Sequence, residues 1–330
     1  MQTKKDLRKK ELAPELDENR RLCDTKHKSH WSKMKASVKR NYWLYLFLFP
    51  TLLWYVIFHY VPIGGIYIAF TRYTGVTTIF ESKWVGLKWF KSFFKSHYAM
   101  TAIKNTLALS LYNLATFPIP VIIALALNEV RNQKFKKFSQ TIMYAPHFIS
   151  TVVLVSMLSL FFNPNYGFIN TIIEMMGGEA RNFMQESGAF RHLYVWSGVW
   201  QDFGWNCIIY VAALSSVDPG LHEAATIDGA SRIQRILHIN IPSIMPTIII
   251  TLILKLGHIM SASTDKVLLM LNELNSSTAE VIGTLVYDRG LLSGDFSYAT
   301  AIGLFTNVVN FVLLLIVNHA SKKVSETSLF

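Results

Sequence analysis

Residues 45–70 read YLFLFPTLLWYVIFHYVPIGGIYIAF, a block without a single Asp, Glu, Lys or Arg. A helix of about 20 apolar residues crosses the roughly 30 Å hydrocarbon core of a bilayer, so this block is long enough to span a membrane. It starts after more than 40 residues and is too long for a cleaved signal peptide. We therefore expect the chain to be inserted in a membrane rather than secreted.

Five more apolar blocks follow, and they extend the same prediction over the chain. The six predicted spans are Tyr45–Phe70, Thr106–Val130, Thr141–Phe162, Leu193–Ser215, Met245–Thr264 and Tyr298–Val317. Of the 330 residues, 51% are hydrophobic and only 16% are charged, where a soluble domain has about a quarter. We predict an all-α integral membrane protein, with a cytoplasmic amino-terminal extension over residues 1–42 and a six-span domain over residues 43–330. Prolines in or near the spans, such as Pro62 and Pro146, predict kinks.

The distribution of Lys and Arg predicts the orientation. With the amino terminus in the cytoplasm, 21 of the 32 Lys and Arg residues lie inside, 10 lie outside and Lys255 lies within a span. Because cytoplasmic loops carry the excess of cations, both termini are predicted to be cytoplasmic. The net charge of +11 is spread over a tail and short loops, which argues against a nucleic-acid partner. The first outer loop, around residues 83–95, interleaves cations with aromatic residues and predicts a short amphipathic helix at the membrane surface, with an ordinary exposed loop as the alternative.

The loop between the fourth and fifth spans, residues 218–242, reads DPGLHEAATIDGASRIQRILHINIP. Asp218 can cap a helix whose first turn holds Pro219, and Gly229 can end it because glycine accepts a positive φ. Ser231 can start a second helix, which we expect to end near Pro242. A helix-turn-helix this small cannot bury itself. We expect it to dock into a partner on the cytoplasmic face.

This loop is similar to the EAA motif of binding-protein-dependent ABC importer permeases, which reads E-A-A, three residues, G, nine residues, I, one residue and L-P. The matching positions, with isoleucine in place of leucine near the end, are Glu223, Ala224, Ala225, Gly229, Ile239, Ile241 and Pro242. Asp228 adds the Asp-Gly-Ala that is usual in the carbohydrate-uptake class. Most of the chain after Tyr42 shares the resemblance: residues 86–90 (GLKWF) and 104–106 (KNT) look like the outer-loop signature of that class. Residues 280–287 (EVIGTLVY) and 296–305 (FSYATAIGLF) resemble the branch that imports oligosaccharides and polysaccharide fragments, including aldouronate or alginate pieces.

The resemblance implies a type I ABC importer permease fold in the bacterial cytoplasmic membrane, which moves a saccharide by alternating access. It implies four partners besides the lipid bilayer: a second, homologous permease subunit, two ATPase subunits and an extracytoplasmic solute-binding protein. The residues implied in coupling to the ATPase are Glu223, Ala224, Ala225, Asp228, Gly229, Ile239 and Pro242. The chain has no G-x-x-x-x-G-K-[ST] run, so we expect it to bind no cofactor, with ATP and Mg held by the ATPase subunits.

Polar residues inside spans are the candidates for a substrate pathway, because a central Lys costs about 2.5–3.5 kcal/mol on insertion scales. The candidates are Trp200, Gln201, Asn206, Lys255, His258, Asn307 and Asn310. Aromatic faces and planar polar groups suit sugars, and Lys255 could pair with a substrate carboxylate. Each candidate has a structural alternative: bonds between helices for the polar groups, with structure favoured for His258.

Other functions find little support in the sequence. His222-Glu223 lacks a second, helix-spaced His, so it is no zinc site, and we predict neither catalytic nor metal-binding residues and no enzyme activity. The alternatives to saccharide import are a permease of the same family for glycerol phosphate or an amino acid, and a self-sufficient secondary transporter. The last would be expected to show inverted repeats and helices broken at the midplane, and the sequence indicates neither.

Overall fold

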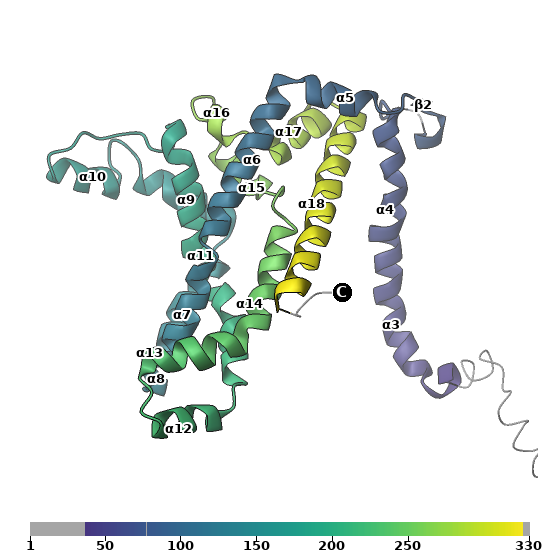
Figure 1. Cartoon of the computed structure of the whole chain (residues 1–330). Helices are drawn as coiled ribbons and strands as arrows, with labels where there is room; N and C mark the ends of the chain where they lie inside the picture. Colours follow the sequence, from purple (N-terminus) through teal and green to yellow (C-terminus); the bar gives the residue numbers. More distant parts are fainter. Residues whose placement is uncertain (1–36, 77, 326–330) are drawn as a thin grey trace, which may run out of the picture. The chain divides into compact units, whose positions relative to one another are not determined.

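The computed structural model describes residues 37–76 and 78–325, which are largely helical (Figure 1). The chain divides into two compact units, Met1–Gly65 and Ile66–Phe330. The elements, with 3-10 and π turns labelled η, are α3 (Tyr42–Tyr55), η1 (Val56–Tyr60), α4 (Val61–Ile63), η2 (Gly64–Phe70), β1 (Thr71–Arg72), η3 (Ile79–Glu81), β2 (Lys83–Trp84), α5 (Lys88–Lys95), α6 (His97–Ala115), α7 (Pro118–Asn128), α8 (Gln133–Tyr144), η4 (Ala145–Phe148), α9 (Thr151–Phe161), α10 (Phe168–Met175), α11 (Ser187–Ser215), α12 (Pro219–Ile227), α13 (Arg232–Arg235), η5 (Ile236–Asn240), α14 (Ile241–Leu256), α15 (Thr264–Met270), α16 (Ser276–Ala279), α17 (Ile282–Tyr287), η6 (Asp288–Leu292) and α18 (Phe296–Ser325). Most of the predicted amino-terminal extension, with Cys23, lies outside the described residues.

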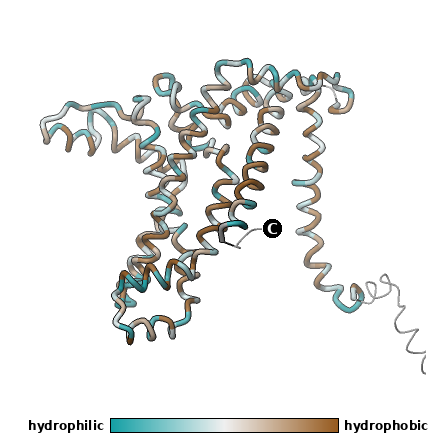
Figure 2. The backbone as a smooth tube through the Cα atoms, viewed as in Figure 1, coloured by the Kyte–Doolittle hydropathy of each residue, from teal (hydrophilic) through white to brown (hydrophobic). Residues whose placement is uncertain are grey.

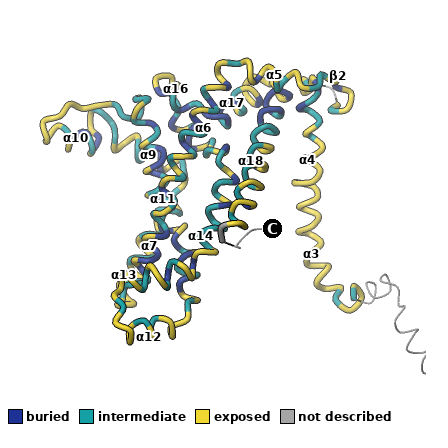
Figure 3. The backbone as a smooth tube through the Cα atoms, viewed as in Figure 1, coloured by how far each residue is buried: buried dark blue, intermediate teal, exposed yellow. Residues whose placement is uncertain are grey.

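The first predicted span is one long apolar helix. The stretch Tyr42–Phe70 is 29 residues long and apolar enough to cross a membrane. No side chain of α3, η1 or α4 is buried within the chain (Figure 3), although nearly all are apolar (Figure 2). The π turn η1 ends two residues before Pro62, and the wider turn accommodates a residue that cannot donate a backbone hydrogen bond.

Within the described residues, four helices meet the length and composition of a membrane span, and a fifth does so if a bent pair is counted as one. The bent pair, Gln133–Phe148 with Thr151–Phe161, turns by 95° and corresponds to the predicted third span. The kink predicted from Pro146 is therefore present, since Pro146 lies in the turn η4 that ends the first arm. The predicted fourth span is the 29-residue helix α11, which is too polar to meet the criterion, so the count of six spans stays a prediction.

The predicted bounds of two spans and one predicted helix end are wrong. The predicted second and fifth spans belong to longer apolar stretches, His97–Asn128 and Arg232–Leu256, and the latter ends eight residues before the predicted end at Thr264. The second helix of the loop 218–242 does not end near Pro242. It continues through η5 into α14, because the Ile241 N–H donates to the carbonyl of Ile236, five residues back. This widened turn lets Pro242 follow without the clash that proline causes in a regular helix.

The predicted amphipathic helix in the first outer loop is present as α5, preceded by a hairpin that pairs β1 with β2. Its apolar face packs against protein. Phe93 is 1% exposed, with its ring centroid 5.7 Å from that of Phe305 in α18. Phe94 is exposed but also contacts Phe305 with its ring. The prediction of a short amphipathic helix is confirmed, and the main contact of this helix is α18.

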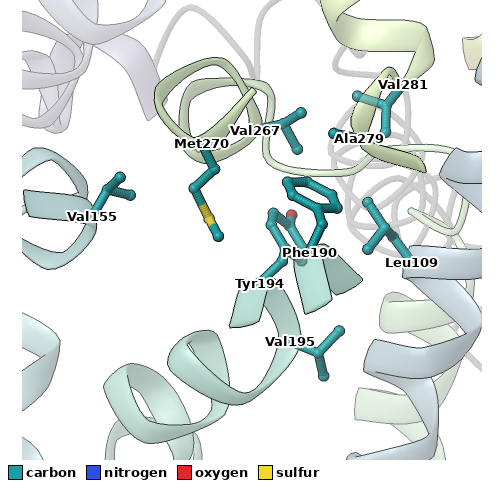
Figure 4. Packing of buried hydrophobic residues seen from close by; sticks show 9 residues of the cluster. All are labelled: Leu109, Val155, Phe190, Tyr194, Val195, Val267, Met270, Ala279 and Val281. Atoms are coloured by element: carbon teal, nitrogen blue, oxygen red, sulfur yellow. The ribbon is translucent and has the colours of Figure 1, made fainter. Parts of the chain in front are cut away.

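The helix α11 is the scaffold of the second unit, and it packs against α7, α8, α14 and α16. Figure 4 shows one end of its core, where Phe190, Tyr194 and Val195 of α11 meet side chains from α6, α9, α15 and the α16–α17 region. A second cluster packs Cys207, Tyr210 and Leu214 against α7 and α14. The two clusters lie at different positions along α11, and the polar stretch around residues 198–206 lies between them.

Candidate functional site: coupling helix and polar cavity

The helix α12, which carries the residues predicted for coupling, has the ends that the sequence predicts. The Asp218 Oδ1 accepts a hydrogen bond from the Gly220 N–H at 2.9 Å, and Pro219 opens the first turn. Gly229 has φ +76° and ends the helix, with the Ala230 N–H donating to the Ala225 carbonyl at 2.9 Å. Such an end favours glycine, because a side chain in this left-handed conformation meets its own backbone.

The second helix of the loop is fixed against the first. Ser231 and Gln234 form a capping box, in which each side chain accepts from the backbone N–H of the other. An Arg235 Nη donates to the Thr226 Oγ1 at 3.0 Å and so ties the two helices together. Further on, the fully buried Asn240 side chain has no hydrogen-bond partner among the described residues, at the end of the π turn η5.

No residue of α12 is buried (Figure 3). The exposed side chains include apolar ones, with Ile227 at 86%, Leu221 at 50% and, from α13, Ile233 at 69% of their surface. Of the residues predicted for coupling, those on the exposed surface are Glu223, Ala224, Asp228, Gly229 and Pro242, while Ala225 and Ile239 are partly buried. Exposed apolar side chains beside small residues are the features of a docking surface.

A cavity of about 630 Å³ lies beside α11 in the second unit. Its size is within the roughly 300–1,000 Å³ of small-ligand sites. Three of the residues predicted for the substrate pathway line it, namely Gln201, Asn206 and Lys255. Gln201 is in addition tied to the protein, since its Nε2 donates to the Ile149 carbonyl at 2.7 Å.

The other predicted pathway residues lie elsewhere. Trp200 lines a separate hollow of about 380 Å³ whose walls are mostly apolar, together with Trp196. Asn310 links α18 to the segment between α14 and α15, because its Oδ1 accepts from the Met260 N–H and its Nδ2 donates to the Ser261 Oγ, both at 3.0 Å. His258 bonds the Leu254 carbonyl in its own helical stretch, and Asn307 is exposed.

Lys255 reaches across the cavity wall to α6. Its Nζ donates to the Asn113 carbonyl at 2.9 Å and lies 3.4 Å from the Asn113 Oδ1. The ammonium also lies 5.8 Å from the centroid of the Phe117 ring, within reach of a cation–π contact. These partners are neutral, so the positive charge is solvated by dipoles and is not cancelled.

Lys266 is a functional candidate that the sequence analysis missed. It was counted with an outer loop, but it lies in α15 with 6% of its surface exposed, and it lines the same cavity. Its Nζ donates to the Tyr194 carbonyl at 2.9 Å. Gly198 makes room for it, because a Cβ there would be 3.2 Å from the Nζ. The residues just before Lys266 in the sequence are polar and do not indicate burial. Its burial depends on contacts in the fold, such as the one with Gly198.

The cavity lining holds more positive than negative charge. Its carboxylate is Asp202, which already accepts a hydrogen bond from the His147 Nδ1–H at 2.9 Å. No carboxylate of the described residues lies within 4.0 Å of the Lys255 or Lys266 ammonium. Neither ammonium group therefore forms an ion pair with a described carboxylate, although Asp202 in the same lining acts electrostatically on Lys266. The arrangement suits a polar ligand that brings negative charge of its own.

Comparison with known proteins supports an assignment to a transport family. Residues 117–326 match the family model described as "Binding-protein-dependent transport system inner membrane component". Protein LplB of Bacillus subtilis (strain 168) is 42% identical over 296 residues, covering 89% of this chain and 93% of its own. The polygalacturonan/rhamnogalacturonan transport system permease protein YteP of the same organism is 43% identical over 289 residues, covering 87% of this chain and 90% of its own.

A solved structure agrees with these relatives. A bacterial alginate ABC transporter, crystallised in complex with an alginate pentasaccharide-bound periplasmic protein, contains a chain with a TM-score of 0.82 and 37% identity. The match covers 89% of this chain and 99% of that chain.

Proposed function

The chain belongs to the family of binding-protein-dependent transport system inner membrane components, and we propose that it is the permease subunit of an ATP-driven importer of acidic oligosaccharides. A permease of this family is a transport subunit and not an enzyme. The observation that carries the acidic class is the pair of ammonium groups, Lys255 and Lys266, in one cavity without carboxylate partners.

The energetic argument is that buried cations need compensation. Lys255 lies in the last turn of α14, and Lys266 lies in α15 with only 6% of its surface exposed. Removing a charged group from water is costly unless other groups compensate for the lost hydration. The main-chain carbonyls of Asn113 and Tyr194 supply part of the compensation. The rings of Phe117 and Tyr194 add to it through cation–π contacts. A uronate carboxylate supplies the remainder when substrate is present, since a charge-assisted hydrogen bond is worth about 1.5–3 kcal/mol. The similar YteP and the alginate transporter handle acidic polysaccharides by their names, which supports the same class here.

The other substrate contacts that we propose are those predicted residues that line the cavity, Gln201 and Asn206. Amide groups can donate to and accept from sugar hydroxyls. We restrict the pathway to residues of this cavity.

The importer works with partners. We propose a second permease subunit, two ATPase subunits that hold ATP and Mg, and an extracytoplasmic solute-binding protein, all in or at the bacterial cytoplasmic membrane, with both termini of this chain in the cytoplasm. The exposed α12 supports an ATPase contact through Glu223, Ala224, Ala225, Asp228 and Gly229, with Ile239 and Pro242 beyond it. Its surface combines apolar and charged side chains in a helix too short to be stable alone.

The test uses the complete transporter in vesicles, with uptake and substrate-stimulated ATP hydrolysis as readouts. Lys255→Met is expected to lower uptake of an acidic oligosaccharide by roughly 10–100-fold, the equivalent of one charge-assisted hydrogen bond. Uptake of a neutral oligosaccharide of the same length should not fall. Lys91→Met, which removes an exposed charge in α5, is the matched control.

Equal effects of Lys255→Met on both oligosaccharides would contradict the acidic class and assign the lysine a structural role. Glycerol phosphate is the second candidate substrate, because two ammonium groups also suit a phosphate. If glycerol phosphate stimulates ATP hydrolysis and the oligosaccharides do not, glycerol phosphate replaces the acidic oligosaccharide as the proposed substrate.

A further inference from the structure

We propose that the indole of Trp205 is the platform on which a sugar ring of the substrate stacks, and that His147 and Asp202 position it. The inference rests on the proposed function, since it concerns the same cavity. Trp205 lines this cavity together with other residues of α11, but it was not among the pathway candidates chosen from the sequence.

Trp205 is the aromatic side chain best presented to the cavity. Five aromatic residues line it, namely Phe117, Tyr194, Phe203, Trp205 and Tyr210. Tyr194 and Tyr210 are buried, Phe117 and Phe203 are partly buried, and Trp205 is 44% exposed. Phe117 and Tyr194 are also engaged by the two lysine ammonium groups. Of these five side chains, the indole is the most exposed, and neither lysine ammonium lies over it.

One face of this indole is held from behind. The His147 imidazole lies parallel to it, with ring centroids 4.3 Å apart and an angle of 7° between the planes. His147 is not among the residues that line the cavity, whereas Trp205 is, so the proposal assigns the indole face opposite His147 to the substrate. Asp202 fixes the imidazole by accepting from its Nδ1–H at 2.9 Å, and Phe148 meets the indole edge-on at 5.9 Å.

The stack exists because two segments approach closely. A Cβ at Gly204 would lie 2.0 Å from the Met143 carbonyl oxygen, so only glycine lets the end of α8 rest on the backbone of α11. The next turn, η4, then carries His147 over Trp205 and next to Asp202. Asp202 and Trp205 are three residues apart on α11 and share a face. The bend in the predicted third span therefore places the His147 imidazole against the Trp205 indole.

The chemistry fits a pyranose. One face of a sugar ring presents C–H groups, and the face of an aromatic ring carries partial negative charge that attracts them. The hydroxyl groups at the ring edge remain free to bond Asn206. The carboxylate of a uronate remains free to contact the two lysines. Stacking does not depend on the charge of the substrate. A neutral sugar should lose as much as an acidic one when the indole is removed.

The test measures equilibrium binding to the detergent-solubilised complex of both permeases and the ATPase, with the binding protein omitted. The probes are trigalacturonate and its carboxyl-reduced, neutral trimer. Trp205→Ala is expected to raise the Kd of both trimers about tenfold, which equals about 1.4 kcal/mol. His147→Ala should raise both about threefold, while His147→Phe, which keeps a ring behind the indole, should stay near wild type.

Trp200→Ala is the matched control. It removes the same side chain from the same helix at nearly the same exposure, 43%, but from the apolar hollow, and both Kd values should stay unchanged. Should Trp205→Ala fail to assemble, Trp205→Leu keeps apolar packing against His147 without a flat face and should weaken binding as much. Lys255→Met should weaken binding of trigalacturonate only.

The outcomes separate the two proposals. Wild-type Kd values for both trimers in Trp205→Leu would overturn the platform, as would a loss confined to trigalacturonate. A Lys255→Met complex that binds trigalacturonate as wild type, with the indole effect present, would overturn the acidic class and leave the platform standing. No binding of either trimer to the wild-type complex would overturn both.

Discussion

Replacing Gly229 tests whether the loop that follows α12 transmits ATP-driven motion to the membrane helices. Its φ of +76° places an L-residue in the left-handed region, at about 1–2 kcal/mol per residue. A Cβ at this position would meet no atom within 4 Å, so the backbone term is the whole penalty for Gly229→Ala. Since 1.4 kcal/mol is a tenfold change, the native loop geometry should become roughly 5- to 30-fold less favoured. Gly229→Val should act more strongly, because a β-branched side chain tolerates positive φ poorly.

We expect Gly229→Val to give a folded, membrane-inserted permease that loses uptake. The assay is co-purification of the ATPase with the permease, together with substrate-stimulated ATP hydrolysis in reconstituted vesicles. Gly229→Asn should retain most activity, because Asn is the residue after glycine that best accepts this conformation. Gly294→Val is the matched control, since Gly294 has φ +73° and equally open space but lies in another loop. Wild-type assembly and stimulation in Gly229→Val would refute the reasoning and show that this loop is not the transmission element.

Glu223→Ala should weaken ATPase stimulation more mildly than Gly229→Val in the same assay, because it removes one charged contact and keeps the turn. A single cysteine at His222 should react with an impermeant reagent only in inside-out vesicles, and labelling from outside intact cells would contradict the predicted orientation. Gly198→Leu should displace the Lys266 ammonium, 3.2 Å from the added Cβ, and lower the uptake ratio of acidic to neutral oligosaccharide; an unchanged ratio would show that Lys266 does not sense substrate charge. Gly204→Ala should lower the thermal unfolding temperature by several degrees through about 1–3 kcal/mol of overpacking against Met143, whereas Gly303→Ala, in open space within α18, should not.

The parts of the site that sequence could predict are those set by near neighbours in the chain. The caps at Asp218 and Ser231 and the stop at Gly229 involve residues two to five positions apart, so their residue types alone indicate the geometry. The kink near Pro146 follows in the same way from one proline. Local physics predicts only that the helix-turn-helix docks into a partner. The resemblance to the EAA motif is what implies an ATPase subunit as that partner.

The parts that sequence could not predict depend on contacts between distant segments. Lys266 was placed outside because its local surroundings are polar, while its burial depends on Gly198, far away in the chain. Trp205 looked like one of several tryptophans, and its backing by His147 requires the approach of α8 at Gly204. Pro242 was read as a helix end because a π turn leaves no signature in residue types.

The π turn η5 gives the helix that follows it the properties of a lever arm. From Asn240 to Lys255 is 15 residues, about 22 Å of helix at 1.5 Å per residue. A tilt of about 10° about the π turn would carry the Lys255 end through roughly 4 Å, taking the length of the arm from that rise. This exceeds the 2.9 Å hydrogen bond by which Lys255 holds the Asn113 carbonyl. A small rotation of the loop 218–242 about this turn would therefore detach the ammonium from the Asn113 carbonyl, and the buried Asn240 amide, which has no hydrogen-bond partner among the described residues, lies at the pivot.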